Sequence, residues 1–203
     1  MGRILGILPF VMIGLAVGGL GAMHVYMTSP SAVGEPPASW PLTSIDRRDG
    51  AWTLVVAIHP KCPCTVASVA ELTEVIRKSP ADLDVVGIVR VPFTATDAVA
   101  ASWTSTLLVE SLRDATNDKV RIIEDHTGTL AERFGALTSG HAILFDTDGT
   151  RRFEGGVTKA RGMRGDNAGI AAVRALLDGR EPAVTSTPVF GCPISSTRTL
   201  ASE

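Results

Sequence analysis

The chain has 203 residues, which is enough for one domain of ordinary size with extensions. Its 19 Lys and Arg residues nearly balance its 21 Asp and Glu residues, giving a formal net charge of −2. The sequence also lacks a basic cluster with interleaved aromatics, so it does not have the electrostatic pattern of a nucleic-acid-binding protein, and no nucleic-acid partner is expected.

The N-terminal segment is continuously apolar. Ile4 to Met23 contains no charged residue, and as a helix this stretch would reach about 30 Å, the thickness of a bilayer's hydrocarbon core. Arg3 precedes it and no Lys or Arg follows before Arg47, which favours a cytoplasmic N-terminus and an exported domain. We therefore expect residues 1–27 to be a single-pass transmembrane anchor in the cytoplasmic membrane, with the domain in the periplasm or extracytoplasmic space. A cleaved signal sequence ending near Gly21-Ala22 is the alternative.

Residues 28–50 are rich in Pro, Ser and Gly and poor in apolar side chains. This composition predicts a linker that holds the domain away from the membrane. Within this linker, we expect the Trp40 side chain to dock on the domain.

From Ala51 the pattern alternates between strands and helices. Buried apolar runs predict the strands, whereas apolar stripes with start and stop signals predict the helices. In chain order, the predicted elements are strand Trp52–Ile58, helix Thr65–Ser79, strand Asp84–Val91, helix Asp97–Arg113, strand Val120–Ile123 and helix Thr129–Phe134. Thr129 and Glu132 have the spacing of a capping box at the start of the last of these helices.

The pattern then becomes antiparallel. An Asp-Gly turn at 146–149 separates strands His141–Phe145 and Thr150–Gly155, which predicts a β-hairpin. Asp166 is expected to cap a final helix that ends at Gly179.

These elements predict an α/β domain at residues 51–180, with a central mixed sheet and helices on both faces. Residues 181–203 form a C-terminal tail that carries Cys192.

Cys62 and Cys64 flank Pro63 where a predicted buried strand gives way to a helix. A cysteine at a helix N-terminus is near the positive end of the helix dipole and near unpaired N–H groups, and both favour the thiolate. Lys61 adds a positive charge nearby. We expect Cys62 to be a nucleophile with a lowered pKa and Cys64 to be its resolving partner.

Cys192 is the third cysteine. Its neighbours Val189-Phe190 and Pro193 predict that the tail docks on the domain, and we expect it to return to the Cys62 and Cys64 site. Three roles are open to Cys192: a resolving cysteine, a metal ligand, or a partner in a mixed disulfide with another chain.

Metal binding is a second hypothesis for the same site. Cys62 and Cys64 can direct two thiolates at one soft ion, and His59 and His141 are candidate additional ligands. Copper, zinc or an iron–sulfur cluster would accept this donor set. Each histidine is equally explained as an ordinary surface or core residue, and outside this hypothesis no cofactor is required.

A strand that runs into a cysteine-containing turn, a helix, and then a βαββα ending together resemble the thioredoxin superfamily. Leu54–Leu72 (LVVAIHPKCPCTVASVAEL) is similar, without gaps, to the membrane-tethered thioredoxin-like reductases of bacterial cytochrome c maturation. In that register Cys62 falls on the family's attacking cysteine, and Thr65 falls where its second cysteine belongs. Gly140 falls where the family has a cis-proline, so the chain departs from the family twice.

Four segments (HPKCPCT, TSGHAILFD, GDNAG and TPVFGCPI) together resemble the small bacterial group of exported thioredoxin-like proteins labelled RedB. The resemblance implies a thioredoxin-like fold and a membrane-anchored thiol–disulfide oxidoreductase with a protein thiol or disulfide as its partner. The alternative is a thiolate metal-binding protein that handles copper. If the chain is an enzyme, the expected activity is thiol–disulfide exchange.

Overall fold

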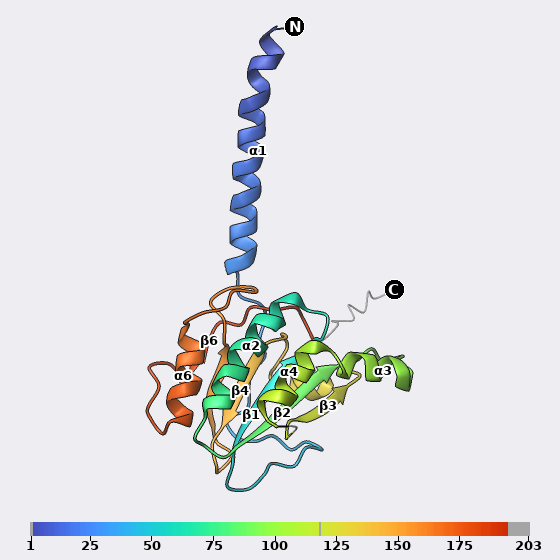
Figure 1. The fold of residues 1–203 in the computed structure, drawn as a ribbon, viewed down its shortest axis with the longest axis vertical. Coiled ribbons are helices and arrows are strands. Elements are labelled where there is room, and N and C mark those ends of the chain that lie inside the picture. Colours follow the sequence, from blue (N-terminus) through green and yellow to red (C-terminus); the bar gives the residue numbers. More distant parts are fainter. Residues whose placement is uncertain (1, 118, 195–203) are drawn as a thin grey trace.

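The computed structural model describes residues 2–117 and 119–194. Helix α1 (Gly2–Thr28) stands out from the domain (Figure 1). Its segment Phe10–Thr28 has 19 residues, a mean hydropathy of 1.7 and no burial inside the protein. At 1.5 Å per residue this segment is about 28 Å long, so it is long and apolar enough to cross a membrane, as a signal sequence would also be.

The domain is built on a six-stranded sheet with the order β3-β2-β1-β4-β5-β6. Three neighbouring strands are parallel: β1 (Trp52–Ile58), β2 (Leu83–Arg90) and β3 (Arg121–Asp125). Strands β4 (His141–Phe145) and β5 (Arg151–Gly156) form an antiparallel hairpin. The short strand β6 (Ser186–Thr187) is parallel to β5. The predicted mixed sheet is therefore confirmed, and β6 is an addition.

One face of the sheet is covered by helices, which Figure 1 shows in front of the strands. The larger core lies on this face, where apolar side chains of β1 and β4 meet those of the helices. The helices that contribute to it are α2 (Pro63–Lys78), α3 (Asp97–Thr104), α4 (Leu107–Ala115) and α6 (Ala168–Leu177). The other face carries the short helix α5 (Thr129–Arg133) and a second core, so helices lie on both faces as predicted.

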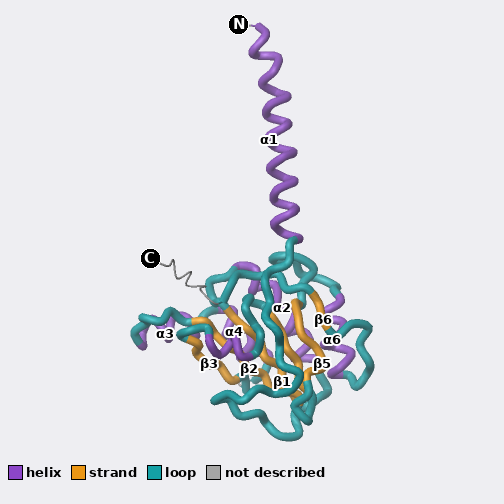
Figure 2. Tube along the Cα trace, turned by 180° about the vertical axis from the view of Figure 1, so that it is seen from behind, coloured by secondary structure: helices purple, strands orange, loops and turns teal. Residues whose placement is uncertain are grey.

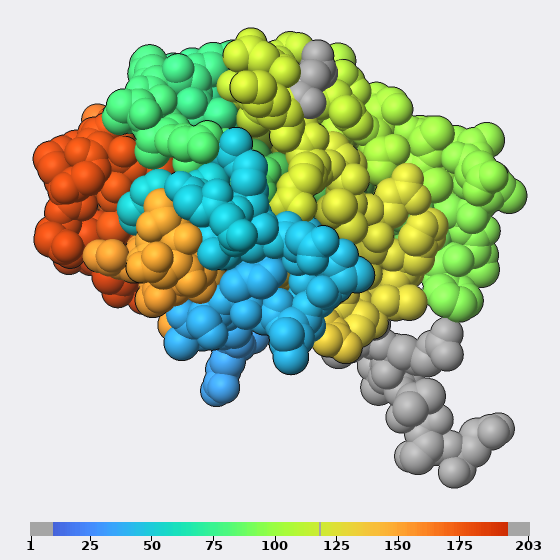
Figure 3. Space-filling model, turned by 90° about the horizontal axis from the view of Figure 1, so that it is seen from below, coloured from blue at the N-terminus to red at the C-terminus, as the bar shows by residue number. Residues whose placement is uncertain are grey.

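Part of the linker packs against the domain, and Trp40, the side chain expected to dock, makes these contacts. The Trp40 ring packs edge-on against Phe134 and Phe145, with ring centroids 5.1 and 5.2 Å apart, and Ile45 is buried in the second core. Loops cross this face of the sheet in Figure 2, and Figure 3 shows linker residues in blue against the underside of the domain. A few well-placed apolar residues therefore outweigh the segment's Pro- and Gly-rich composition.

Two helix starts differ from the predictions. The capping box at Thr129 does not form, because Gly128 is the N-cap residue and makes no side-chain cap. Instead, the buried Asp125 carboxylate accepts hydrogen bonds from the N–H groups of Gly128 and Ala131, at 2.8 and 2.9 Å. Helix α6 is capped by Asn167 and not by Asp166, since the Asn167 side chain accepts a bond from the Ile170 N–H group.

The predicted helix Asp97–Arg113 is two helices, α3 and α4, with a break at Ser105-Thr106. Ala100 is the buried residue of α3, whereas α4 buries four apolar side chains. The exposed first half therefore has no packing requirement that would keep the two halves in one continuous helix.

Candidate functional site

Cys62 lies at the N-cap of α2, immediately after β1. Its φ of −88° and ψ of 114° are extended, and Pro63 occupies the first turn, where its missing N–H group costs nothing. The Cys62 N–H group donates to the His59 carbonyl at 2.9 Å, and the Thr65 N–H group donates to the Cys62 carbonyl at 3.2 Å. These turns fix the sulfur at the positive end of α2, where the side chain is only 2% exposed.

The tail segment, residues 189–194, brings Cys192 to this site. The sulfur atoms of Cys62 and Cys192 are 2.8 Å apart, although 130 positions separate the two residues in sequence. This distance is a hydrogen-bonded contact between free cysteines, and it exceeds the covalent S–S length of about 2.05 Å by less than 1 Å. A small movement would therefore bring the two sulfurs to bonding distance, and transfer of two electrons to a disulfide oxidant, with loss of two protons, would form the bond.

Cys64 lies one residue further into α2 and is half-buried. Like Cys62 and Cys192, it is a free cysteine in this structure. Arg161, from the loop after β5, is close enough to Cys64 to favour its charged form. Both candidate resolving cysteines interact with Cys62: the Cys192 sulfur lies 2.8 Å from the Cys62 sulfur, and a hydrogen bond with Cys62 is among the causes that raise the pKa of Cys64.

Polar groups around Cys62 connect α2 to the turn before β4. The Ser139 hydroxyl accepts a hydrogen bond from the His59 N–H group at 2.7 Å and lies 2.5 Å from the Thr65 hydroxyl. Gly140, at the family's proline position, has a φ of +87°, and its N–H group donates to the Ala57 carbonyl at 2.8 Å. The turn at residues 138–140 thus lies beside the cysteine site, as the resemblance implies.

The three thiols have different pKa values. Burial alone would raise the pKa of Cys62, but hydrogen bonds from Cys192 and Thr65 outweigh burial and lower it below its ordinary value. Burial raises the pKa of Cys64, and the neighbouring charge on Cys62 adds to this effect. Burial, together with its hydrogen bond to Cys62, raises the pKa of Cys192 to about 12. Cys62 is therefore the thiol of the three whose pKa is lowered, and its hydrogen bond with Cys192 is one of the causes.

The two candidate histidine ligands have neighbours outside the cysteine site, although the buried Nδ1 atom of His141 has no hydrogen-bond partner among the described residues. The His59 ring packs edge-on against Trp103 at 5.4 Å between centroids, and burial lowers its pKa. His141 is fully buried, with its Nε2 atom 3.0 Å from a carboxylate oxygen of Glu154. Among the described residues, no group of three or more His, Cys, Asp or Glu side chains is arranged to hold a metal ion. Binding of copper, zinc or an iron–sulfur cluster stays a prediction.

Several residues of the site had no clear signal in the sequence. Arg161 belongs to a basic loop that is most simply interpreted as solvated, and Ser139 is one of many serines. Thr65 is different, because it occupies the family's second cysteine position and could have been singled out as a neighbour of the Cys62 sulfur.

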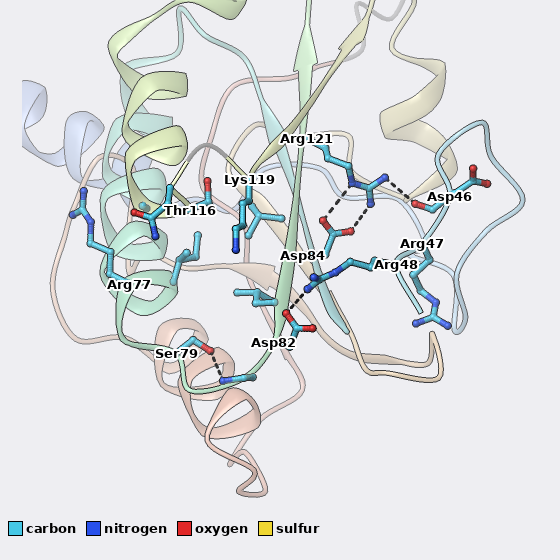
Figure 4. A pocket seen from close by; sticks show the side chains of 16 residues that line it. Asp46, Arg47, Arg48, Arg77, Ser79, Asp82, Asp84, Thr116, Lys119 and Arg121 are labelled. Atoms are coloured by element: carbon cyan, nitrogen blue, oxygen red, sulfur yellow. Dashed lines mark hydrogen bonds and ion pairs between the residues drawn. The ribbon is translucent and has the colours of Figure 1, made fainter. Parts of the chain in front are cut away.

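A surface cavity of about 830 Å³ lies away from the cysteines, at the C-terminal end of α2 (Figure 4). Charged side chains make up half of its lining residues. Many of these pair with one another: Arg121 forms two hydrogen bonds to Asp84, and Arg48 bonds to Asp82. We interpret this cavity as an ion-paired surface of the fold and not as part of the cysteine site.

Comparison with known proteins places the chain at the level of the fold. No family model matches it, and no curated protein does. The sheet order, the parallel strands followed by an antiparallel hairpin, and the helix that starts at Cys62 define a thioredoxin-like fold.

Two solved structures extend over most of the chain. A hypothetical protein from Sinorhizobium meliloti is 21% identical, with 85% of this chain and 98% of that chain covered and a TM-score of 0.53. An uncharacterized conserved protein from Geobacillus kaustophilus is 17% identical, with 85% and 95% covered and a TM-score of 0.50. A secreted disulfide oxidoreductase from Mycobacterium tuberculosis is more distant, at 15% identity, 64% and 83% coverage and a TM-score of 0.43. At these identities the similarity concerns the fold alone.

Proposed function

We propose that this chain is a membrane-anchored, extracytoplasmic thiol–disulfide oxidoreductase in which Cys62 attacks and Cys192 resolves. The observation that carries the proposal is the 2.8 Å contact between these two sulfurs at the N-terminus of α2. A lowered pKa on Cys62 supplies the nucleophile, since the thiolate is the attacking species in disulfide exchange.

The exchange has two steps. The Cys62 thiolate attacks a partner disulfide, so that a Cys62–partner bond forms while the partner's own S–S bond breaks and one partner thiolate leaves. Cys192 then loses its proton to that leaving thiolate or to solvent and attacks the Cys62 sulfur, which releases the second partner sulfur. The partner gains two electrons, and the protein keeps a Cys62–Cys192 disulfide. The same steps in reverse oxidise a partner dithiol.

Cys192 is suited to the second step because it stays protonated until Cys62 has formed the mixed disulfide. Its raised pKa keeps it as a thiol while Cys62 carries the negative charge. When Cys62 becomes part of a mixed disulfide, that charge disappears, and two of the causes that raise the pKa of Cys192 disappear with it. Attack by Cys192 is therefore favoured only after the partner is bound.

We further propose that α1 remains as the anchor, with the N-terminus inside and the domain outside. The distribution of Lys and Arg supports this orientation, because Arg3 precedes the apolar segment and the next basic residue is Arg47. The site lies close to the end of α1, since the Arg161 N–H group donates to the Met27 carbonyl at 3.0 Å. A protein partner at the membrane surface could reach a site in this position. The resemblance to the RedB group and to the reductases of cytochrome c maturation also supports such a partner.

Reduction of a glutathionylated peptide by the full-length protein in detergent tests this function. The reduced protein should release free peptide, and Cys62→Ser should slow the release by at least about a hundredfold because the nucleophile is lost. Cys192→Ser should stop after the first step, with glutathione attached to Cys62. Peptide release by Cys62→Ser at the rate of the unmodified protein would exclude the proposal.

A further inference from the structure

The tail segment lies across the cysteine site and forms an isolated antiparallel bridge with the turn before β4. The Ser139 N–H group donates to the Cys192 carbonyl at 2.9 Å, and the Ile194 N–H group donates to the Leu137 carbonyl at 2.8 Å. Between these bonds, Thr138 pairs with Pro193, at a position where the strand needs no N–H donor. The backbone at residues 137–139 is therefore a docking edge for an extended peptide, and here it holds the chain's own tail.

The fit between the tail and this edge is close at the residue before the cysteine. A Cβ atom on Gly191 would lie 2.0 Å from the Ser139 carbonyl oxygen and 3.0 Å from the Thr138 methyl group. Since real Cβ atoms essentially never approach backbone so closely, the edge accepts glycine and rejects every other residue at this position. Ile194, on the other side of the cysteine, is 2% exposed and packs into the second core.

Three side chains outside the tail fasten it, and one of them, Arg90, donates from its Nε atom to the Ile194 carbonyl at 3.1 Å. The Ser31 hydroxyl donates to the Gly191 carbonyl at 2.8 Å, and the Gly191 N–H group donates back to that hydroxyl at 3.2 Å. The Arg161 guanidinium donates to the same Gly191 carbonyl and, at 2.8 Å, to the Ser31 hydroxyl. Arg161 also donates to the Tyr26 carbonyl at 3.1 Å, so the fastening is attached to the end of α1.

A docked tail closes Cys62 to other proteins. The side chain of Cys62 is 2% exposed, and the nearest backbone edge is already paired with the tail. A partner disulfide on a polypeptide needs both the sulfur and space for its backbone. It can obtain them only when residues 189–194 move away, and Cys192 can resolve the mixed disulfide only after this segment returns to the site.

We propose that the tail segment is a displaceable latch: an internal peptide ligand that occupies the docking edge at residues 137–139 and closes Cys62 to polypeptide partners. The partner it gives way to is an extended segment with glycine directly before its reactive cysteine. This inference rests on the proposed function, because it assigns the substrate class and the regulation of the same cysteine site. Arg161 is a positioning residue that holds the latch closed.

The test uses full-length protein in detergent with Cys64→Ser and Cys192→Ser, so that Cys62 is the remaining thiol and the tail stays intact. The probe is the peptide Thr-Pro-Val-Phe-Gly-Cys-Pro-Ile, with thionitrobenzoate on its cysteine. The Cys62 thiolate attacks the peptide sulfur, the bond to thionitrobenzoate breaks, and the coloured thionitrobenzoate anion that leaves is measured. The small disulfide dithiobis(nitrobenzoate) reports the reactivity of Cys62 without a peptide.

Opening the latch should accelerate the peptide reaction. Adding Arg161→Ala, or separately Gly191→Val, should raise the peptide rate by about tenfold or more, because charge-assisted bonds or close backbone contacts of the tail are lost. The ratio of peptide rate to small-disulfide rate should rise in the same proportion. Arg164→Ala is the matched control from the same loop, since Arg164 is exposed and pairs with Glu71, and it should leave both rates unchanged.

The peptide itself provides a control that does not depend on the folding of any variant. With the latch open, replacing its glycine by alanine should slow the reaction by about tenfold or more, because the added Cβ meets the docking edge. Equal rates for both peptides, with no effect of Arg161→Ala or Gly191→Val, would overturn the latch while a reactive Cys62 preserved the oxidoreductase proposal. A Cys62 that reacts with neither the peptides nor the small disulfide would overturn both.

Discussion

The reactivity of the site depends on which of its three sulfurs carries the charge. Cys62 receives hydrogen bonds from Cys192 and Thr65 that outweigh its burial, whereas Cys64 and Cys192 both have raised pKa values. A protein with three equivalent thiols would have several competing disulfides under oxidising conditions. Here the difference in pKa supports the proposal that Cys62 is the attacking thiolate and that Cys192 stays protonated until it resolves the mixed disulfide.

Alkylation of reduced protein by iodoacetamide, followed at the Cys62 peptide by mass spectrometry, measures this pKa. A lowered pKa means that the thiolate is present above the lowered value and is lost as the pH falls through it. Half-maximal alkylation of Cys62 should therefore occur below about pH 8.5, the ordinary thiol value. Thr65→Val should move the midpoint upward, because a hydrogen bond to the thiolate is lost.

The matched control for Thr65→Val is Thr73→Val, on the same helix, whose hydroxyl bonds to the Ala70 carbonyl and not to the site. It should leave the midpoint where it is. A Cys62 midpoint at or above about 8.5 would contradict the assignment of the thiolate.

At the scale of elements, the turn before β4 has a glycine that proline cannot replace, at the position where the resembled family has a cis-proline. Gly140 has a φ of +87°, far from the value of about −65° that proline requires, and its N–H group is bonded to Ala57. A Cβ atom at Gly140 would lie 2.7 Å from the Ser68 hydroxyl. The departure from the family is therefore built into the backbone.

Substitutions at Gly140 should be costly. Gly140→Ala should lower the free energy of unfolding by about 1–3 kcal/mol, and Gly140→Pro should lower it further, through strain and the lost hydrogen bond. Gly50→Ala is the matched control, since Gly50 has a similar φ of +73° but open space around it, so only the backbone cost remains. Urea unfolding of the full-length protein gives both values. A Gly140→Pro protein as stable as the unmodified chain would refute this account of the turn.

The elements next to the site were predictable because their signals are local. The β-branched run of Trp52–Ile58 matches β1 residue for residue, and Pro63 marks the first turn of α2. The break between α3 and α4 and the cap at Asn167 were not predicted. The first arises because α3 is mostly exposed, and the second because neighbouring residues with similar capping tendency differ only in tertiary context.

At the scale of the whole molecule, the linker and the tail, which lie outside the predicted domain, both pack against it. The linker covers the second face of the sheet, and the tail covers the cysteine site. Sequence pattern could not give these contacts in detail, because a contact such as that of Cys192 with Cys62 joins positions 130 residues apart and has no local periodicity. The expectations that Trp40 docks and that the tail returns to the Cys62 and Cys64 site came from single residues: a lone aromatic side chain, an odd third cysteine and the apolar residues beside it.

The linker makes a clear prediction about stability. Trp40→Ala should lower the free energy of unfolding by about 2–4 kcal/mol, because its ring fills the space between Phe134 and Phe145. Leu42→Ala, two residues away and 94% exposed, should change it by less than about 0.5 kcal/mol. Urea unfolding monitored by circular dichroism compares the two variants. Equal effects would mean that the linker is a spacer after all.

The central claim is that Cys62 and Cys192 form the redox pair, and mapping the disulfide of the oxidised full-length protein tests it most directly. After mild oxidation and trypsin digestion, the account predicts a peptide containing Cys192 linked to the peptide that carries Cys62 and Cys64. The link should persist in Cys64→Ser and disappear in Cys62→Ser. A bond between Cys62 and Cys64, with Cys192 still a free thiol, would contradict the claim.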